Sequence, residues 1–93
     1  MSKNDIAIED KRNLLEAQIE EARKTIYRTT VEVAIAQEMI EYGHKLTNSK
    51  DDNERNLAAS YVQTGQSRQY ENKGIRTQME LAIKACEKLL KSL

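Results

Sequence analysis

Apolar side chains recur every three or four residues through the first half of the chain, which is the spacing of one face of an α-helix. Read as a seven-residue repeat, they form a β-branched row at Ile19, Ile26, Val33 and Ile40 and a mostly small row at Ile8, Leu15, Ala22, Thr29, Ala36 and Gly43. A further apolar line runs through residues 31–46, so this part is apolar on a wider face than one neighbouring helix covers. We therefore predict a helix over about residues 5–46 whose second half contacts two neighbours.

The polar run at residues 47–53 predicts a turn, in which Asn48, Ser49 or Asp52 is positioned to cap the next helix. A second helix is then expected over about residues 54–92. Its apolar stripe begins at Leu57, Ala58, Tyr61 and Val62, is lost over residues 63–74, and returns at Ile75, Met79, Ala82, Ile83, Cys86, Leu89, Leu90 and Leu93.

Residues 63–74, called the polar gap below, leave the continuity of this second helix open. Gly65 and Gly74 each cost about 1 kcal/mol relative to alanine in a helix interior. The gap is therefore either continuous helix, with or without a kink, or a loop at residues 64–67 that divides the helix in two. We favour the continuous helix.

Composition supports helix throughout, because the chain has no proline and only three glycines among 93 residues. The predicted fold is an all-α antiparallel hairpin of two long helices, forming a single domain over residues 1–93. Such a small helical unit often gains stability by self-association, so we expect a four-helix dimer or a larger bundle. The residues predicted to form the oligomer interface are Val31, Ile35, Met39, Tyr42, Leu46, Ile83 and Leu90.

In this hairpin the polar gap lies opposite a second polar and basic segment in the first helix. The two segments would form a basic belt made of Arg23, Lys24, Tyr27, Arg28, Arg68, Tyr70, Lys73 and Arg76. Guanidinium and ammonium groups bind phosphate, and tyrosine rings offer faces on which a base can stack. The belt is therefore a candidate site for a phosphorylated ligand such as a nucleotide. The simpler interpretation is a solvated face whose cations pair with Glu32, Glu71 or acids of a second subunit.

Charge and hydropathy bound the class of partner. Fifteen basic and fifteen acidic side chains give a formal net charge of zero, so binding of nucleic acid is not expected. The longest apolar run is only a few residues, and the first residues lack a signal-peptide pattern, so we expect a soluble, cytoplasmic protein without a membrane segment. A lone cysteine, Cys86, is consistent with a reducing compartment.

Catalytic and metal-binding patterns are not evident. The single histidine, His44, follows Gly43 near the end of the first helix and has no cysteine or aspartate partner nearby. Cys86 lies on the returning apolar stripe, where it is expected to be a small buried side chain. We therefore predict no enzyme activity, no metal site and no cofactor.

No motif assigns the chain to a family. Its size and hairpin plan are loosely similar to several groups of small helical proteins, including type III secretion chaperones and phage-encoded inhibitors such as oligomeric sponges for cyclic nucleotides. Shape alone does not carry function. Two hypotheses follow: a non-enzymatic, homo-oligomeric protein that engages a protein partner through a helical face, and an oligomer that sequesters a nucleotide or cyclic nucleotide in the basic belt.

Overall fold

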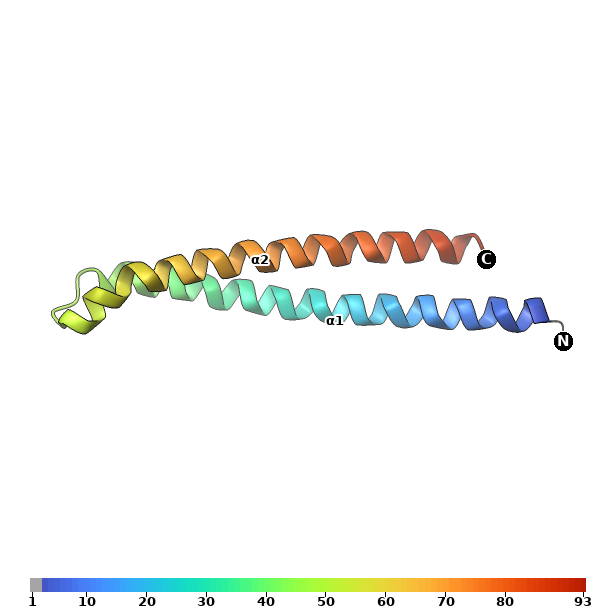
Figure 1. Cartoon of the computed structure of the whole chain (residues 1–93), viewed down its shortest axis with the longest axis horizontal. Helices are drawn as coiled ribbons and strands as arrows, with labels where there is room; N and C mark the ends of the chain where they lie inside the picture. The colour runs from blue at the N-terminus through green and yellow to red at the C-terminus, as the bar shows by residue number, and fades with distance from the viewer. Residues whose placement is uncertain (1–2) are drawn as a thin grey trace.

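The computed structural model describes residues 3–93 and the side chains of residues 7–93. It contains two helices, α1 (Lys3–Leu46) and α2 (Asp52–Lys91), which pack antiparallel so that both termini lie at the same end (Figure 1). The molecule is 74 Å long and only 16 Å by 13 Å in cross-section. The predicted all-α hairpin is therefore confirmed, with helix bounds within two residues of those expected.

The turn between the helices is held by side chains that bind the free backbone groups at the start of α2. Asp51 is the N-cap, and its Oδ1 accepts hydrogen bonds from the backbone N–H groups of Asn53 (2.8 Å) and Glu54 (3.4 Å). The prediction of Asn48, Ser49 or Asp52 as cap was therefore wrong, because Asp51 has an extended backbone and its carboxylate accepts from these donors. Ser49 supports the turn, since its Oγ accepts from the Asp51 N–H (3.1 Å) and donates to the Glu54 carboxylate (2.6 Å).

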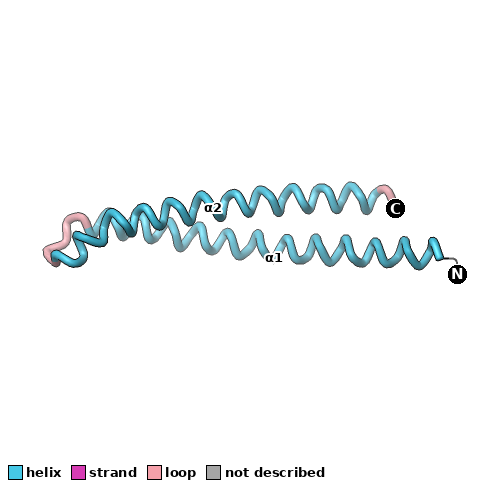
Figure 2. The backbone as a smooth tube through the Cα atoms, in the orientation of Figure 1, coloured by secondary structure: helices cyan, strands magenta, loops and turns pink. Residues whose placement is uncertain are grey.

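The polar gap is continuous α-helix, as Figure 2 shows along the whole of α2. One position of the gap, Gly65, is a close contact between the helices. Gly65 is buried, and a Cβ at this position would lie 2.9 Å from the Ala36 carbonyl oxygen and 2.8 Å from Ile40 Cγ1. Gly43 is in the same situation, since a Cβ there would lie 3.1 Å from the Ala58 carbonyl oxygen. Two glycines thus allow direct backbone contact near the turn.

Small side chains fill most of the space between the helices. The buried residues are Ile19, Ala22, Thr29, Ala36, Gly43, Ala58 and Gly65, and Ala36 is fully covered. The predicted small row therefore faces α2. Thr29 is tolerated there because its hydroxyl donates to the Ile26 carbonyl oxygen (2.7 Å), which leaves no unpaired polar atom on this side chain.

This core is thin for a protein of 93 residues. No large side chain among the described residues is fully buried. The accessible surface is 7309 Å², whereas a compact monomer of this mass exposes about 5,500 Å². The radius of gyration is 21.1 Å, against about 12 Å for a compact domain of this length. A single hairpin thus leaves on the order of 1,800 Å² more surface in water than a globular chain does.

Candidate functional site: the open face of the hairpin

The rows of residues that face the partner helix also fix which rows face outward. In α1 the inward rows contain Ala36 and Ile40, and in α2 they contain Val62 and Gly65, because these residues meet across the interface. In an antiparallel helix pair, residues seven positions apart lie on the same side of their helix and form one row. The remaining rows divide into two flanks, one on each side of the line of contact.

One flank carries most of the exposed apolar side chains, and we call it the open face. Two rows of α1 belong to this face: one contains Leu14, Arg28, Ile35 and Tyr42, and the other contains Lys11, Glu32, Met39 and Leu46. Two rows of α2 belong to it as well: one contains Leu57, Thr64 and Glu71, and the other contains Tyr61, Arg68, Ile75 and Leu89. Contacts between the helices confirm the assignment. Glu32 lines one shallow groove with Arg68 and Glu71, and Leu14 lines another with Leu89.

Large apolar groups are exposed on this face at both ends of the hairpin. Near the turn, 61% of Tyr42, 59% of Leu57 and 40% of Tyr61 is accessible. Near the termini, Leu14 and Leu89 are 67% and 55% accessible and line an apolar groove. Burying such a side chain stabilises a protein by roughly 1.5–3 kcal/mol, so covering the open face would be favourable.

The middle of the open face is polar and charged. The guanidinium of Arg68 lies 3.9 Å from the Glu32 carboxylate and 3.6 Å from Met39 Sδ, so it bridges the two helices. Thr64, Glu71 and Asn72 line the same groove. Asn72 donates to the Arg68 carbonyl oxygen (2.8 Å), which satisfies its amide within α2. The open face is thus two apolar ends separated by a charged centre.

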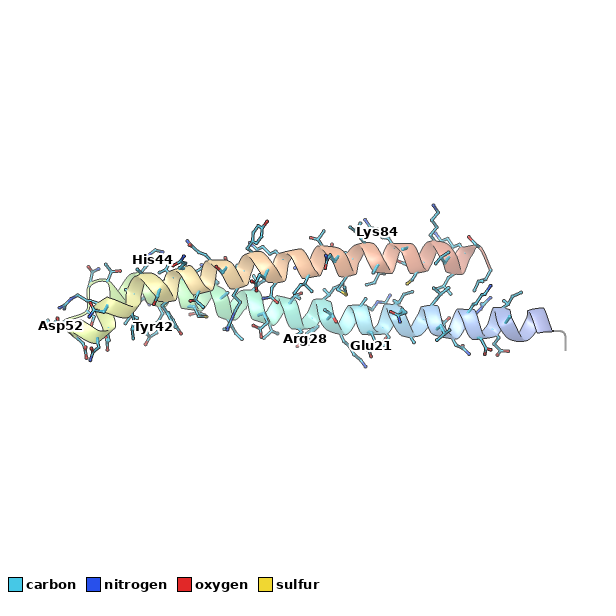
Figure 3. All side chains as sticks on the ribbon, in the orientation of Figure 1. Glu21, Arg28, Tyr42, His44, Asp52 and Lys84 are labelled. Carbon is cyan, nitrogen blue, oxygen red and sulfur yellow. The ribbon has the colours of Figure 1, made fainter. Side chains whose placement is uncertain are left out.

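The opposite flank is mainly polar. In Figure 3, Glu21 and Arg28 lie along the outer edge of α1 and Lys84 lies along the outer edge of α2. The seven-residue spacing places Glu21, Arg28 and Tyr42 in one row. Most of the exposed large apolar side chains are therefore on the open face.

The structure distributes the predicted basic belt over both flanks. Arg28 and Arg68 belong to the open face. The other members lie elsewhere. Lys24 is on an outermost row, Arg76 is on the α2 row that contains Val62, and the rows of the opposite flank carry Arg23, Tyr27, Tyr70 and Lys73. Tyr27 and Tyr70 are 75% and 83% accessible. A single hairpin does not bring the eight belt residues together.

Three of the belt cations have acidic neighbours. Lys24 pairs with Glu21 (3.6 Å), Arg68 with Glu32 (3.9 Å) and Arg76 with Glu80 (2.9 Å). All three pairs are at least one-third exposed, so each contributes little to stability. Within the part of the chain that the structure describes, Arg23, Arg28 and Lys73 make no ion pair.

The predicted oligomer-interface residues fall into two groups. Val31 (45% accessible), Ile35 (43%) and Tyr42 are exposed, and Met39 and Leu46 are half-buried at the edge of the helix contact. Ile83 and Leu90 are half-buried in the α2 row that contains Val62 and faces α1.

The open face also includes residues of α2 that are not in the predicted set. Leu57, Tyr61, Ile75 and Leu89 are all exposed there. The sequence contains the pattern, because these residues lie on two neighbouring rows of the seven-residue repeat. The polar gap interrupts both rows and hides this repeat.

The remaining chemistry-bearing side chains stand alone. His44 is exposed and Cys86 is half-buried. In the described residues no group of three or more His, Cys, Asp or Glu side chains is arranged to hold a metal. Between residues 3 and 93, neither helix has an apolar stretch of the length that a membrane crossing requires.

Comparison with known proteins finds no relative of this chain. No family model matches the sequence, and neither curated proteins nor solved structures give a match.

Proposed function

We propose that this chain is a non-enzymatic, homo-oligomeric helical protein that engages a protein partner through a helical face. The observation that supports this most is the large apolar side chains left exposed at the two ends of the open face. Surfaces of this kind mark sites of protein association, since contiguous exposed apolar area is disfavoured in a monomer. The thin core supports it as well, because a hairpin without large buried side chains gains most from a second apolar surface.

The mass of the protein in solution tests the oligomer, and paired substitutions test the face. We expect the wild-type chain to sediment as more than one copy at micromolar concentration. Replacing Ile35 and Tyr42 by serine should lower the mass to that of a monomer, because two apolar contacts are lost. The matched control replaces Tyr27 and Tyr70, which are more exposed but belong to the opposite flank, and it should keep the wild-type mass.

Partner binding is measured on the same set of proteins. A protein retained by immobilised wild type and by the Tyr27/Tyr70 control, but not by the Ile35/Tyr42 variant, would support engagement through the helical face. A monomeric wild type, or equal behaviour of the two double variants, would contradict the proposal.

The second candidate function is the sequestration of a phosphorylated ligand, such as a nucleotide or cyclic nucleotide, in the basic belt. It is supported by the three belt cations without an acidic neighbour in the described chain, Arg23, Arg28 and Lys73. Since these lie on both flanks, this function requires that a further copy complete the site.

Thermal denaturation with and without nucleotides tests this second candidate. A ligand that binds only the folded state stabilises it by about 2.7 kcal/mol at a hundredfold excess over its dissociation constant. The shift should disappear in Arg28→Ala and Arg76→Ala while the oligomer mass is unchanged. If no nucleotide or cyclic nucleotide moves the transition, the second candidate is wrong.

A further inference from the structure

The inward rows of α2 change from apolar to polar and back to apolar along the hairpin. The rows that contain Val62 and Gly65 carry polar side chains at three successive inward positions, which are Gln69, Asn72 and Arg76. Farther along the same two rows, the inward residues are again apolar: Met79, Ile83, Cys86 and Leu90. We call the three polar positions the polar break.

The helix α1 has a polar side chain at the same level. Gly65 lies against Ala36, and continuing this antiparallel pairing by seven residues in each helix places Asn72 opposite Thr29. Thr29 is only 3% exposed, so the two helices remain in contact here. The contact at this level therefore joins two polar side chains instead of two apolar ones.

The polar groups at this level bond mainly within their own helices. Thr29 and Asn72 donate to backbone carbonyl oxygens three and four residues earlier in the same helix (2.7 and 2.8 Å), and Arg76 pairs with an acid of α2 (2.9 Å). Gln69, on the side of the turn, does reach α1, where it donates to Gln37 (2.9 Å). At the levels of Asn72 and Arg76, the described side chains thus join the helices neither by an ion pair nor by a hydrogen bond.

The polar break divides the buried residues into two groups. Toward the turn they are Ala36, Gly43, Ala58 and Gly65, and toward the termini they are Ile19 and Ala22. We call residues 33–68 the turn half, and the paired segments 7–26 and 77–91 the terminal half. Parts of a protein that share few contacts across a boundary open separately, so each half has the character of its own cooperative unit.

The connection between the helices decides which half opens first. The turn half is closed by the short connection at residues 47–51, so little loop entropy is lost when it pairs. If the turn half opened first, the terminal segments would have to hold closed a loop of residues 27–76, which costs more entropy. Topology therefore favours opening of the terminal half while the turn half stays paired.

Helix propensity points to the same boundary. Gly74 lies within the polar break, and glycine is a poor helix former. A Cβ at Gly74 would have nothing within 4 Å, so this glycine, unlike Gly65, is not required by a close helix contact. A poor helix former and the loss of the apolar rows thus coincide where the two halves meet.

We propose that the terminal half is a separate cooperative unit that opens and closes while the turn half stays paired, with the polar break as the boundary. Opening uncovers inward apolar side chains such as Leu15, Ile19 and Ile83, which are buried or half-buried in the closed hairpin. The two terminal segments then exchange their contact with each other for contact with an apolar surface of a partner. This inference rests on contacts within one chain and does not depend on the proposed self-association.

Hydrogen exchange of the backbone amides, followed by mass spectrometry of peptide fragments, tests the boundary in the intact wild-type protein. Amides inside a helix exchange when their hydrogen bonds open, so the rates report the opening of each half. We expect residues 12–26 and 77–90 to exchange at least about tenfold faster than residues 33–46 and 56–68. The change should occur as a step at residues 27–32 and 69–76. Equal rates in the two halves, or a gradual rise toward the termini without a step, would overturn the proposal.

Filling the polar break should couple the two halves. The double variant Asn72→Leu with Arg76→Leu restores apolar side chains on the inward rows, and it should slow exchange in the terminal half by at least about tenfold. The matched control is Thr77→Leu with Lys84→Leu, which also removes one hydrogen-bonding group and one cation from α2. Both control residues are exposed on the row of Tyr70, and Thr77 likewise donates to a carbonyl oxygen of its own helix (3.1 Å). The control should leave the rates near wild type.

Helix content by circular dichroism shows whether each variant folds. If the two double variants slow exchange equally, or if the filled variant folds and does not slow it, the polar break is not the boundary. The step in the wild-type rates tests the proposal without any substitution. A monomeric wild type would contradict the proposed function and leave this inference intact.

Discussion

Two glycines of α2 offer a matched test of the close helix contact. Gly65 and Gly74 both lie inside the helix, and neither has a positive φ. Replacement by alanine should stabilise a helix by about 1 kcal/mol at either position. The two sites differ only in what the new methyl group meets. Around Gly74 there is nothing within 4 Å, whereas at Gly65 the methyl would meet the Ala36 carbonyl oxygen at 2.9 Å and Ile40 Cγ1 at 2.8 Å.

The magnitudes give opposite signs for the two variants. One of the obstructing atoms at Gly65 is backbone, so α1 and α2 must move apart locally, and overpacking of this kind costs about 1–3 kcal/mol. Set against a gain of about 1 kcal/mol in helix propensity, this cost leads us to expect that Gly65→Ala loses up to about 2 kcal/mol. Gly74→Ala should gain about 1 kcal/mol. For a chain of this size, 1 kcal/mol shifts the midpoint of thermal unfolding by about 4–8 °C.

Thermal unfolding followed by circular dichroism in the far ultraviolet measures both variants against the wild type. All samples must have the same protein concentration, because the midpoint of an oligomer depends on it. A lower midpoint for Gly65→Ala and a higher one for Gly74→Ala are expected. If Gly65→Ala raised the midpoint as much as Gly74→Ala, the backbone contact between the helices would be refuted.

Two further predictions concern the turn and the core. Removing the cap with Asp51→Ala should lower the free energy of unfolding in urea by about 1 kcal/mol, because two backbone N–H groups lose their acceptor. The control Asn53→Ala keeps the cap and should cost less, and equal losses would argue against the cap. Enlarging the fully buried Ala36 to leucine should destabilise the hairpin by about 1–3 kcal/mol. The same change at the exposed Ala34 should be nearly neutral. A neutral Ala36→Leu would contradict the tight contact.

The sequence alone determined the helical hairpin. Its seven-residue repeat identified the row through Ala22, Thr29 and Ala36 that faces the second helix, because a helix places every seventh residue on nearly the same side. The polar run at residues 47–53 located the reversal of the chain. These features depend on local backbone preference and periodicity, which are properties of neighbouring residues.

Tertiary structure decided what the polar gap and the basic belt are. Sequence counted Gly65 as a weak point in a helix, but the structure uses its missing side chain to bring α1 into backbone contact, which no local propensity can reveal. Sequence also grouped the basic residues by their level along the hairpin. The contacts at Gly43 and Gly65 fix the rotation of each helix about its axis. Only this rotation separates Arg28 and Arg68 from Arg23 and Lys73 and places most of the exposed large apolar side chains on one flank.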